Sequence, residues 1–164
     1  MPEAKEIVIN TGPLLALIAG LGSLNVLKVL YKQVIVPYEV CEEIFASGSA
    51  GFGIKEFDEA DFLFKLNKPA KIHPYLSNSL DLGESSVIQT ALDRNIQTVC
   101  IDEAVGRRIA RLNGLTLTGS LGIMIRAKRE GQAVLLRDAV SRMRKHGIWL
   151  SERLVVSALQ QAGE

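Results

Sequence analysis

Four short segments rich in β-branched residues recur along the chain, and each is followed by a helix signal. They are EIVIN at 6–10, QVIVP at 33–37, QTVCID at 97–102 and LTLTG at 115–119. Strands that alternate with helices pair in parallel and are covered on both faces. The pattern therefore predicts an α/β fold with three layers, in which helices flank a central parallel sheet of about four to five strands.

The less regular segments complete this layout. The stretch 47–73 has glycines near its start and no sustained periodicity, so we expect a loop, a short helix near Glu56 and a further strand at 62–66. Beyond Gly131 an amphipathic pattern and then Ser151, a residue suited to an N-cap, predict two helices in a C-terminal layer at about 133–162. With 164 residues, the chain suits one domain, 1–164, with its core at about 6–130.

The composition is that of a soluble globular protein, with 48% hydrophobic and 23% charged residues. Cys41 and Cys100 stand outside any zinc-ligand spacing and do not form a disulfide framework, which favours the reducing cytoplasm. The apolar run LLALIAGLGSL follows a segment with more acidic than basic residues, unlike a signal peptide. No run has the roughly 18 apolar residues of a spanning helix, so we expect a cytoplasmic protein without a membrane anchor.

The net charge of +1 conceals an asymmetry along the chain. Up to Gly106 there are 8 basic and 14 acidic residues, whereas 107–146 contains 10 basic and 2 acidic residues. Phosphates could be attracted to the second part, and the candidate contacts are Arg107, Arg108, Arg126 and Lys128. The alternative is that these are solvated helix faces and favourable charges near helix C-termini. Aromatic residues make up only 5% of the chain, and no platform for base stacking is evident.

Polar residues occupy the ends of two predicted strands. Asn10 ends the first strand, and Asp102 and Glu103 lie at the C-terminal end of the third. Glu84 precedes Ile88 by four positions, so it extends the apolar stripe of its own helix toward the sheet edge. Because chemistry collects at the carboxyl ends of parallel strands, these side chains are expected to share one rim.

Each of these residues also has a purely structural interpretation. Asp102 could be the N-cap of a helix at about 104–112, and Asp81-x-x-Glu84 resembles a capping box. Asn10 could belong to a capped strand-to-helix turn. Glu39, Glu42 and Glu43 follow the second strand and could simply complement a helix dipole, and periodicity does not choose between them.

Several carboxylates at one rim require a cation. Two unit charges about 5 Å apart repel by roughly 3 kcal/mol at an effective dielectric constant of about 20, so such acids bind metal, protonate or pair with bases. Oxygen ligands suit Mg²⁺ or Mn²⁺, which activate water for the hydrolysis of phosphodiesters. The sequence therefore indicates a metal-dependent phosphodiesterase acting on nucleic acid.

The order of these segments resembles that of the PIN-domain nucleases, in the branch related to VapC-type toxins, over about residues 6–130. The pieces that carry the resemblance are IVINTGPLLAL, VIVPYEVCEEI, LDLGESSVIQTAL and TVCIDEAVGRRIARLNGLTLTGSLGIMIRAKREG. The resemblance implies a PIN-like fold, RNA cleavage that depends on a divalent metal, and a role as the toxin of a toxin–antitoxin pair, neutralised by a small antitoxin protein.

The resemblance also assigns roles to single residues. The acids of the family fall on Asn10, Glu43, Glu84 and Asp102, with Glu103 as an additional candidate ligand and Thr11 as a candidate contact to nucleic acid. Asn10 stands where the family usually has aspartate, and its amide brings no charge to the metal. The alternative function is therefore a weakened or inactive PIN-like module that binds RNA or a protein partner.

A homodimer is expected because relatives commonly pair and because LLALIAGLGSLNVLKVL contains Lys28 as its single charged residue. A buried first helix of an α/β fold would produce the same apolar pattern.

Overall fold

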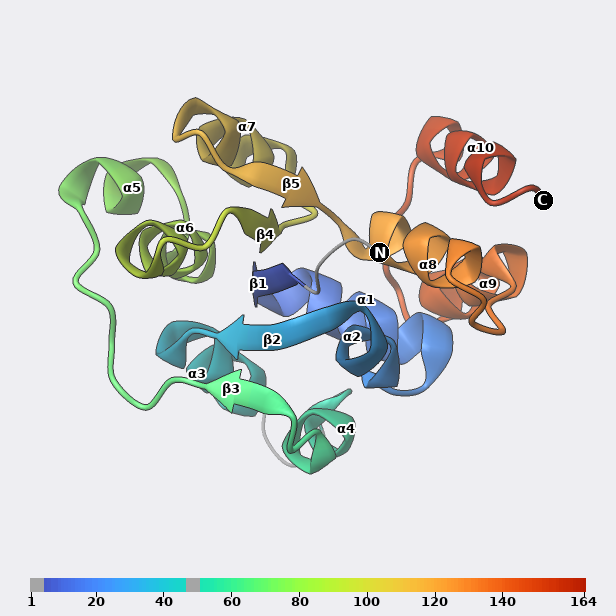
Figure 1. Ribbon diagram of the computed structural model, residues 1–164, viewed down its shortest axis with the longest axis horizontal. Helices are drawn as coiled ribbons and strands as arrows, with labels where there is room; N and C mark the ends of the chain where they lie inside the picture. Colours follow the sequence, from blue (N-terminus) through green and yellow to red (C-terminus); the bar gives the residue numbers. More distant parts are fainter. Residues whose placement is uncertain (1–4, 47–50) are drawn as a thin grey trace.

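A computed structural model describes residues 5–46 and 51–164, and its centre is a parallel sheet of five strands (Figure 1). The strands are β1 (Lys5–Ile9), β2 (Tyr31–Val36), β3 (Leu63–Lys65), β4 (Thr98–Cys100) and β5 (Thr116–Thr118). Their order in the sheet is β3-β2-β1-β4-β5, and every neighbouring pair is parallel. The predicted α/β class is confirmed, as is the further strand expected at 62–66.

Helices connect and cover the strands. They are α1 (Thr11–Leu21), α2 (Asn25–Leu30), α3 (Tyr38–Ala46), α4 (Ile54–Glu59), α5 (Pro74–Ser79), α6 (Leu82–Arg94), α7 (Ala104–Leu112), α8 (Ser120–Arg129), α9 (Leu136–Lys145) and α10 (Glu152–Gln161). The helix α6 packs on β1 and β4, and α7 packs on β5. Figure 1 shows α8, α9 and α10 grouped on one side of the molecule, where α8 and α9 contact α1.

The central strand β1 is buried on both faces, as expected for a parallel sheet between helical layers. Ile7, Val8 and Ile9 are fully buried, and Val8 lies opposite Ile35 of β2 and Val99 of β4. The backbone N–H of Asn10 continues this pairing by donating to the carbonyl oxygen of Cys100 at 3.1 Å. The chain just after β1 is therefore held next to the end of β4.

Some boundaries differ from the sequence-based expectation. The strands β4 and β5 are shorter than predicted, so Asp102 lies two residues after the last residue of β4. The helix α1 already begins at Thr11, which places Pro13 at its third position, where the N–H that proline lacks is not needed. The short helix expected near Glu56 is α4. The start of the predicted loop, residues 47–50, lies outside the described residues.

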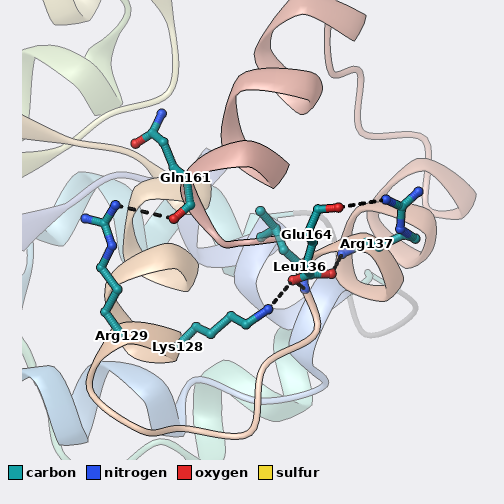
Figure 2. Close-up of polar contacts among 6 residues, drawn as sticks. All are labelled: Lys128, Arg129, Leu136, Arg137, Gln161 and Glu164. Carbon is teal, nitrogen blue, oxygen red and sulfur yellow. Dashed lines mark hydrogen bonds and ion pairs between the residues drawn. The ribbon is translucent and has the colours of Figure 1, made fainter.

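Glu164 links α8 to α9 in the C-terminal layer through several hydrogen bonds (Figure 2). We call the residues involved the C-terminal clamp: Lys128, Leu136, Arg137 and Glu164. One carboxylate oxygen of Glu164 accepts from Nζ of Lys128 at 2.8 Å and from the N–H of Leu136 at 2.6 Å. The other oxygen accepts from the N–H of Arg137 at 3.0 Å. Glu164 therefore caps the first turn of α9 and ties it to the end of α8.

The apolar N-terminal segment, LLALIAGLGSLNVLKVL, packs into the core of the protomer. Leu14, Leu17 and Leu27 are fully buried in the core, and α1 packs against α9 and α8. This burial accounts for the lack of charges in the segment, as the alternative interpretation of the sequence anticipated.

None of the helices in the described ranges combines the length and the apolar content that crossing a membrane requires.

Candidate active site

Asn10 connects the end of β1 to α1, and its side chain is not used as a helix cap. It occupies the N-cap position with an extended backbone, but its side chain accepts no cap hydrogen bond. Its Oδ1 atom is buried and has no hydrogen-bond partner among the described residues. Leaving a buried acceptor unpaired costs about 1–3 kcal/mol. A purely structural turn would not require that cost, so Oδ1 is available to a ligand.

Among the glutamates of α3, Glu43 is the one whose side chain lies beside Asn10. A Cβ atom on Gly83 would lie 2.8 Å from Oε2 of Glu43 and 3.0 Å from Oδ1 of Asn10. The hydroxyl of Thr11 also donates to Oε2 of Glu43 at 3.1 Å. Tertiary structure thus selects among the three glutamates of α3: Glu42 is exposed, and Glu39 is buried and accepts from the N–H of Ala70 at 2.8 Å.

Glu84, in the first turn of α6, is buried, as its position on the apolar stripe predicted. Asp81 is the N-cap of α6 and accepts from the N–H of Glu84 at 2.8 Å, which confirms this half of the capping box. Oε2 of Glu84 has no hydrogen-bond partner in the described ranges and lies against Gly106 of α7. Burial raises the pKa of Glu84 from 4.5 to about 7, and the neighbouring Asp81 and Glu103 contribute to the rise.

Asp102 is not the cap of the helix that follows it, because the N-cap of α7 is Glu103. Instead, Oδ1 of Asp102 accepts from the N–H of Ser120 at 2.9 Å, at the start of α8. The pairing of β4 with β5 brings these two positions together. The side chain of Asp102 is nevertheless exposed, and a Cβ atom on Gly119 would lie only 2.6 Å from Oδ1.

The structure brings Asn10, Glu43, Glu84 and Asp102 to the carboxyl-end edge of the sheet, and we call these four residues the acidic rim. Asn10 and Glu43 meet beside Gly83, which directly precedes Glu84. Oε2 of Glu84 contacts Gly106, and the same glycine lies next to Ile101, the residue before Asp102.

The candidate cations separate into two groups. Arg107 lies near the rim, where Nη1 donates to the carbonyl oxygens of Ile101 at 2.7 Å and Thr118 at 3.2 Å. Arg108 is exposed on α7.

Arg126 and Lys128 lie elsewhere. The guanidinium of Arg126 is 5.1 Å from the ring centre of Tyr31, the first residue of β2, and is therefore at the amino-end edge of the sheet. Lys128 is paired with Glu164. The structure does not bring these two residues to the rim.

The oxygen atoms of the rim fit a small divalent cation in their chemistry. Carboxylate and amide oxygens are the ligands that Mg²⁺ and Mn²⁺ prefer. Two of the rim oxygens, Oδ1 of Asn10 and Oε2 of Glu84, are buried and have no partner among the residues that the structure describes. Within residues 5–46 and 51–164, no group of three or more histidine, cysteine or acidic side chains is arranged to hold a metal ion. As arranged here, a cation would thus have fewer than three acidic ligands, with Asn10 as a neutral one.

Sequence reasoning did not identify the glycines that make room for the rim. Gly83, Gly106 and Gly119 each stand where a Cβ atom would collide with a rim oxygen. The available signal was Gly83, because glycine in the first turn of a helix lowers helix propensity without an evident local reason. The contacts that explain it come from other elements and are not visible in the local sequence.

A parallel five-stranded sheet with an oxygen-rich edge defines an α/β protein with a candidate hydrolytic site. A family model described as a PIN domain matches residues 6–164. The chain belongs to the PIN-domain family, whose members are in general metal-dependent nucleases. No curated protein and no solved structure matches it.

Proposed function

We propose that this protein is a ribonuclease that hydrolyses RNA phosphodiesters with Mg²⁺ or Mn²⁺ bound at the acidic rim. The observation that carries the proposal is that, among the described residues, Oδ1 of Asn10 and Oε2 of Glu84 are buried without partners at the edge of a PIN-type sheet. Oε1 of Glu39 shares this state, but the other oxygen of that carboxylate accepts from the N–H of Ala70. A fold stabilised only by internal contacts would avoid such groups, because a buried unpaired acceptor is costly.

The chain's own residues would then have distinct tasks. Glu84 and Asp102 would hold the ion as charged ligands, Asn10 as a neutral ligand, and Glu43 and Glu103 would add negative charge nearby. A bound divalent ion supplies an activated water and stabilises charge on the phosphodiester. Without the ion, Glu84 with a pKa of about 7 holds a proton for much of the time at neutral pH, which lowers the repulsion at the rim.

Two observations support a second candidate function. Asn10 replaces a charged ligand by a neutral one, and fewer than three acidic side chains converge in the described part of the chain. Weak metal affinity would leave a PIN-like module that binds RNA or a protein partner without cleaving it.

Cleavage of labelled single-stranded RNA with Mn²⁺ tests the choice between these functions. We expect Glu84→Gln and Asp102→Asn each to lower cleavage by about 100-fold, because each removes a few kcal/mol of attraction for the ion. Glu42→Gln is the matched control, since Glu42 is exposed on the same helix as Glu43 and outside the rim. Equal activity of all three variants would remove the rim from catalysis, and an inactive wild-type protein that binds RNA would favour the second function.

The biological role follows as a further proposal from the family. We propose that the protein is the toxin of a toxin–antitoxin pair, acts in the cytoplasm and is neutralised by a small antitoxin protein. Induced expression should then arrest growth in the wild type but not in Asp102→Asn.

We also propose a homodimer, which light scattering at micromolar concentration tests directly. Because the apolar N-terminal segment is buried inside the protomer, it does not support dimerisation. The proposal of a homodimer rests only on the resemblance to PIN-domain proteins, which commonly form dimers.

A further inference from the structure

A groove of about 940 Å³ extends from the acidic rim to the C-terminal layer. Asp102 and Glu103 belong to its lining, as do Trp149 and Leu154 from the C-terminal part of the chain. Its lining includes residues of α1, α7, β5, α8 and α10, and Figure 1 shows how these elements are arranged. Of the acidic rim, Asp102 lines the groove, so the groove reaches the candidate site at this residue.

The side chain of Trp149 is 83% exposed, although tryptophan is among the largest apolar residues and is highly buried on average. The reason lies in the short segment between α9 and α10. Ile148 and Leu150 pack on the core, so the residue between them is directed outward in this extended stretch. It is the single tryptophan of the chain.

Contacts with both flanking helices, α9 and α10, hold this segment in place. The guanidinium of Arg144 donates to the carbonyl oxygen of Leu150 at 3.5 Å and pairs with Glu152 at 2.6 Å. The backbone N–H of Ile148 donates to the carbonyl oxygen of Met143 at 3.1 Å. The indole is therefore presented by an anchored segment, which lowers the entropy lost when a flat ligand stacks on it.

The opposite wall of the groove supplies positive charge. Arg107 and Arg111 of α7 line it, and no hydrogen bond or ion pair engages the guanidinium of Arg111 within the described ranges. Small residues, among them Gly119 and Gly122, line the groove between the walls and let a backbone approach closely. Cations for phosphates and an aromatic face for bases are the two elements that bind single-stranded nucleic acid without sequence preference.

We infer that this groove binds the single-stranded RNA segment adjacent to the scissile bond, with Trp149 stacking on a base and Arg111 contacting a phosphate. The inference rests on the proposed function for its substrate class and adds the subsite and its residues. It also revises the sequence-based view that the chain offers no stacking platform, because the exposure of Trp149 depends on tertiary packing.

The test is a titration of the wild-type protein with a mixed-sequence RNA of about 12 nucleotides in EDTA, followed by the fluorescence of its single tryptophan. Omitting metal separates binding from cleavage. We expect saturable quenching in the wild type and an affinity lowered about 5- to 100-fold in Trp149→Ala, measured with labelled RNA. Trp149→Phe should retain part of the affinity. Leu112→Ala is the control, because Leu112 is 76% exposed on α7 but does not line the groove.

Salt dependence tests the role of Arg111 separately. We expect Arg111→Gln to reduce the slope of log affinity against log salt concentration by about 0.7, the value for one phosphate contact in a single strand. Arg94→Gln, on the far helix α6 and outside the groove, should leave the slope unchanged. Circular dichroism of all variants checks that they fold.

The outcomes separate the groove from the catalytic proposal. RNA binding that depends on Trp149, together with an absence of cleavage in Mn²⁺, would support the groove and contradict the nuclease. Cleavage that depends on Glu84, with unchanged binding in Trp149→Ala and Arg111→Gln, would overturn the groove and leave the nuclease in place. Absence of quenching by RNA would also overturn it and would leave the groove to another occupant, such as a helix of a protein partner.

Discussion

The acidic rim and the C-terminal clamp both place acidic side chains at the starts of helices, but the surroundings of Glu84 in the rim and of Glu164 in the clamp differ in how they satisfy the carboxylate. In the clamp, both carboxylate oxygens of Glu164 accept hydrogen bonds, and the bond from Lys128 lowers its pKa to about 2. In the rim, burial raises the pKa of Glu84 to about 7, and Oε2 has no partner in the described structure. The carboxylate of the clamp is fully paired, whereas that of Glu84 leaves one buried oxygen without a partner among the described residues, which is costly.

The sharpest test of this contrast is the pH dependence of unfolding, compared between wild type and Glu84→Gln in EDTA. Since the pKa of Glu84 is raised from 4.5 to about 7 on folding, its contribution to stability is fully present below about pH 4.5 and is lost as the pH rises through 7. We expect this group to lower the free energy of unfolding by up to about 3 kcal/mol above pH 7. Urea titrations at pH 5 and 8.5 measure it, and equal pH dependence in both proteins would contradict the unpaired state of Glu84.

A smaller effect is expected from Asn10→Asp, which restores the charge that the rim lacks. The change preserves shape, and the added carboxylate should tighten Mn²⁺ binding by about 10- to 100-fold after desolvation and repulsion are counted. The same change should destabilise the metal-free protein, because it adds a buried charge near Glu43. Calorimetry with Mn²⁺ measures the first effect and thermal unfolding in EDTA the second. Unchanged affinity together with unchanged activity on RNA would favour the module that does not cleave.

Two glycines in equivalent helix positions test whether metal binding at the rim depends on the absence of a side chain at Gly83. Gly83 and Gly12 are each the second residue of a helix, but a Cβ atom on Gly12 would have no neighbour within 4 Å. We expect Gly83→Ala to weaken Mn²⁺ binding by about tenfold by displacing Oδ1 of Asn10 and Oε2 of Glu43, and Gly12→Ala to have little effect on it. Equal affinities in the two variants would show that the space beside Gly83 is not used.

A change of similar, small size is expected in the clamp itself. Glu164→Ala removes the acceptor at the start of α9 and the partner of Lys128, so we expect a loss of about 1–2 kcal/mol in the free energy of unfolding at pH 7. Because the pKa of Glu164 is lowered to about 2, this contribution is present above about pH 4.5 and is lost as the pH falls through 2. Glu130→Ala is the control, since it removes an exposed pair with Arg126 worth less than about 0.5 kcal/mol. If Glu164→Ala lowered the free energy of unfolding no more than Glu130→Ala does, the clamp would not stabilise the fold more than an exposed ion pair.

Much of the fold was predictable because its signals are local. The β-branched segments marked the strands and the apolar stripe of α6 placed Glu84 in the core, since both patterns depend on neighbours within a few positions. The N-caps of α6 and α10, Asp81 and Ser151, were predictable for the same reason. The alternative interpretation of Asp102 as the cap of the next helix is wrong, because its hydrogen-bond partner, Ser120, lies 18 positions away and is brought near by the pairing of β4 with β5.

The sequence by itself determined the parallel α/β architecture and the polar residues that end β1 and follow β4. Only the tertiary structure decided which glutamate of α3 reaches the rim, that Arg126 and Lys128 lie away from it, and that Trp149 faces a groove. The physical reason is that these facts depend on contacts between distant segments: Thr11 meets Glu43 across 32 positions, and Lys128 meets Glu164 across 36. Periodicity specifies which face of an element is buried, whereas the pairing of a charge depends on what the rest of the chain places beside it.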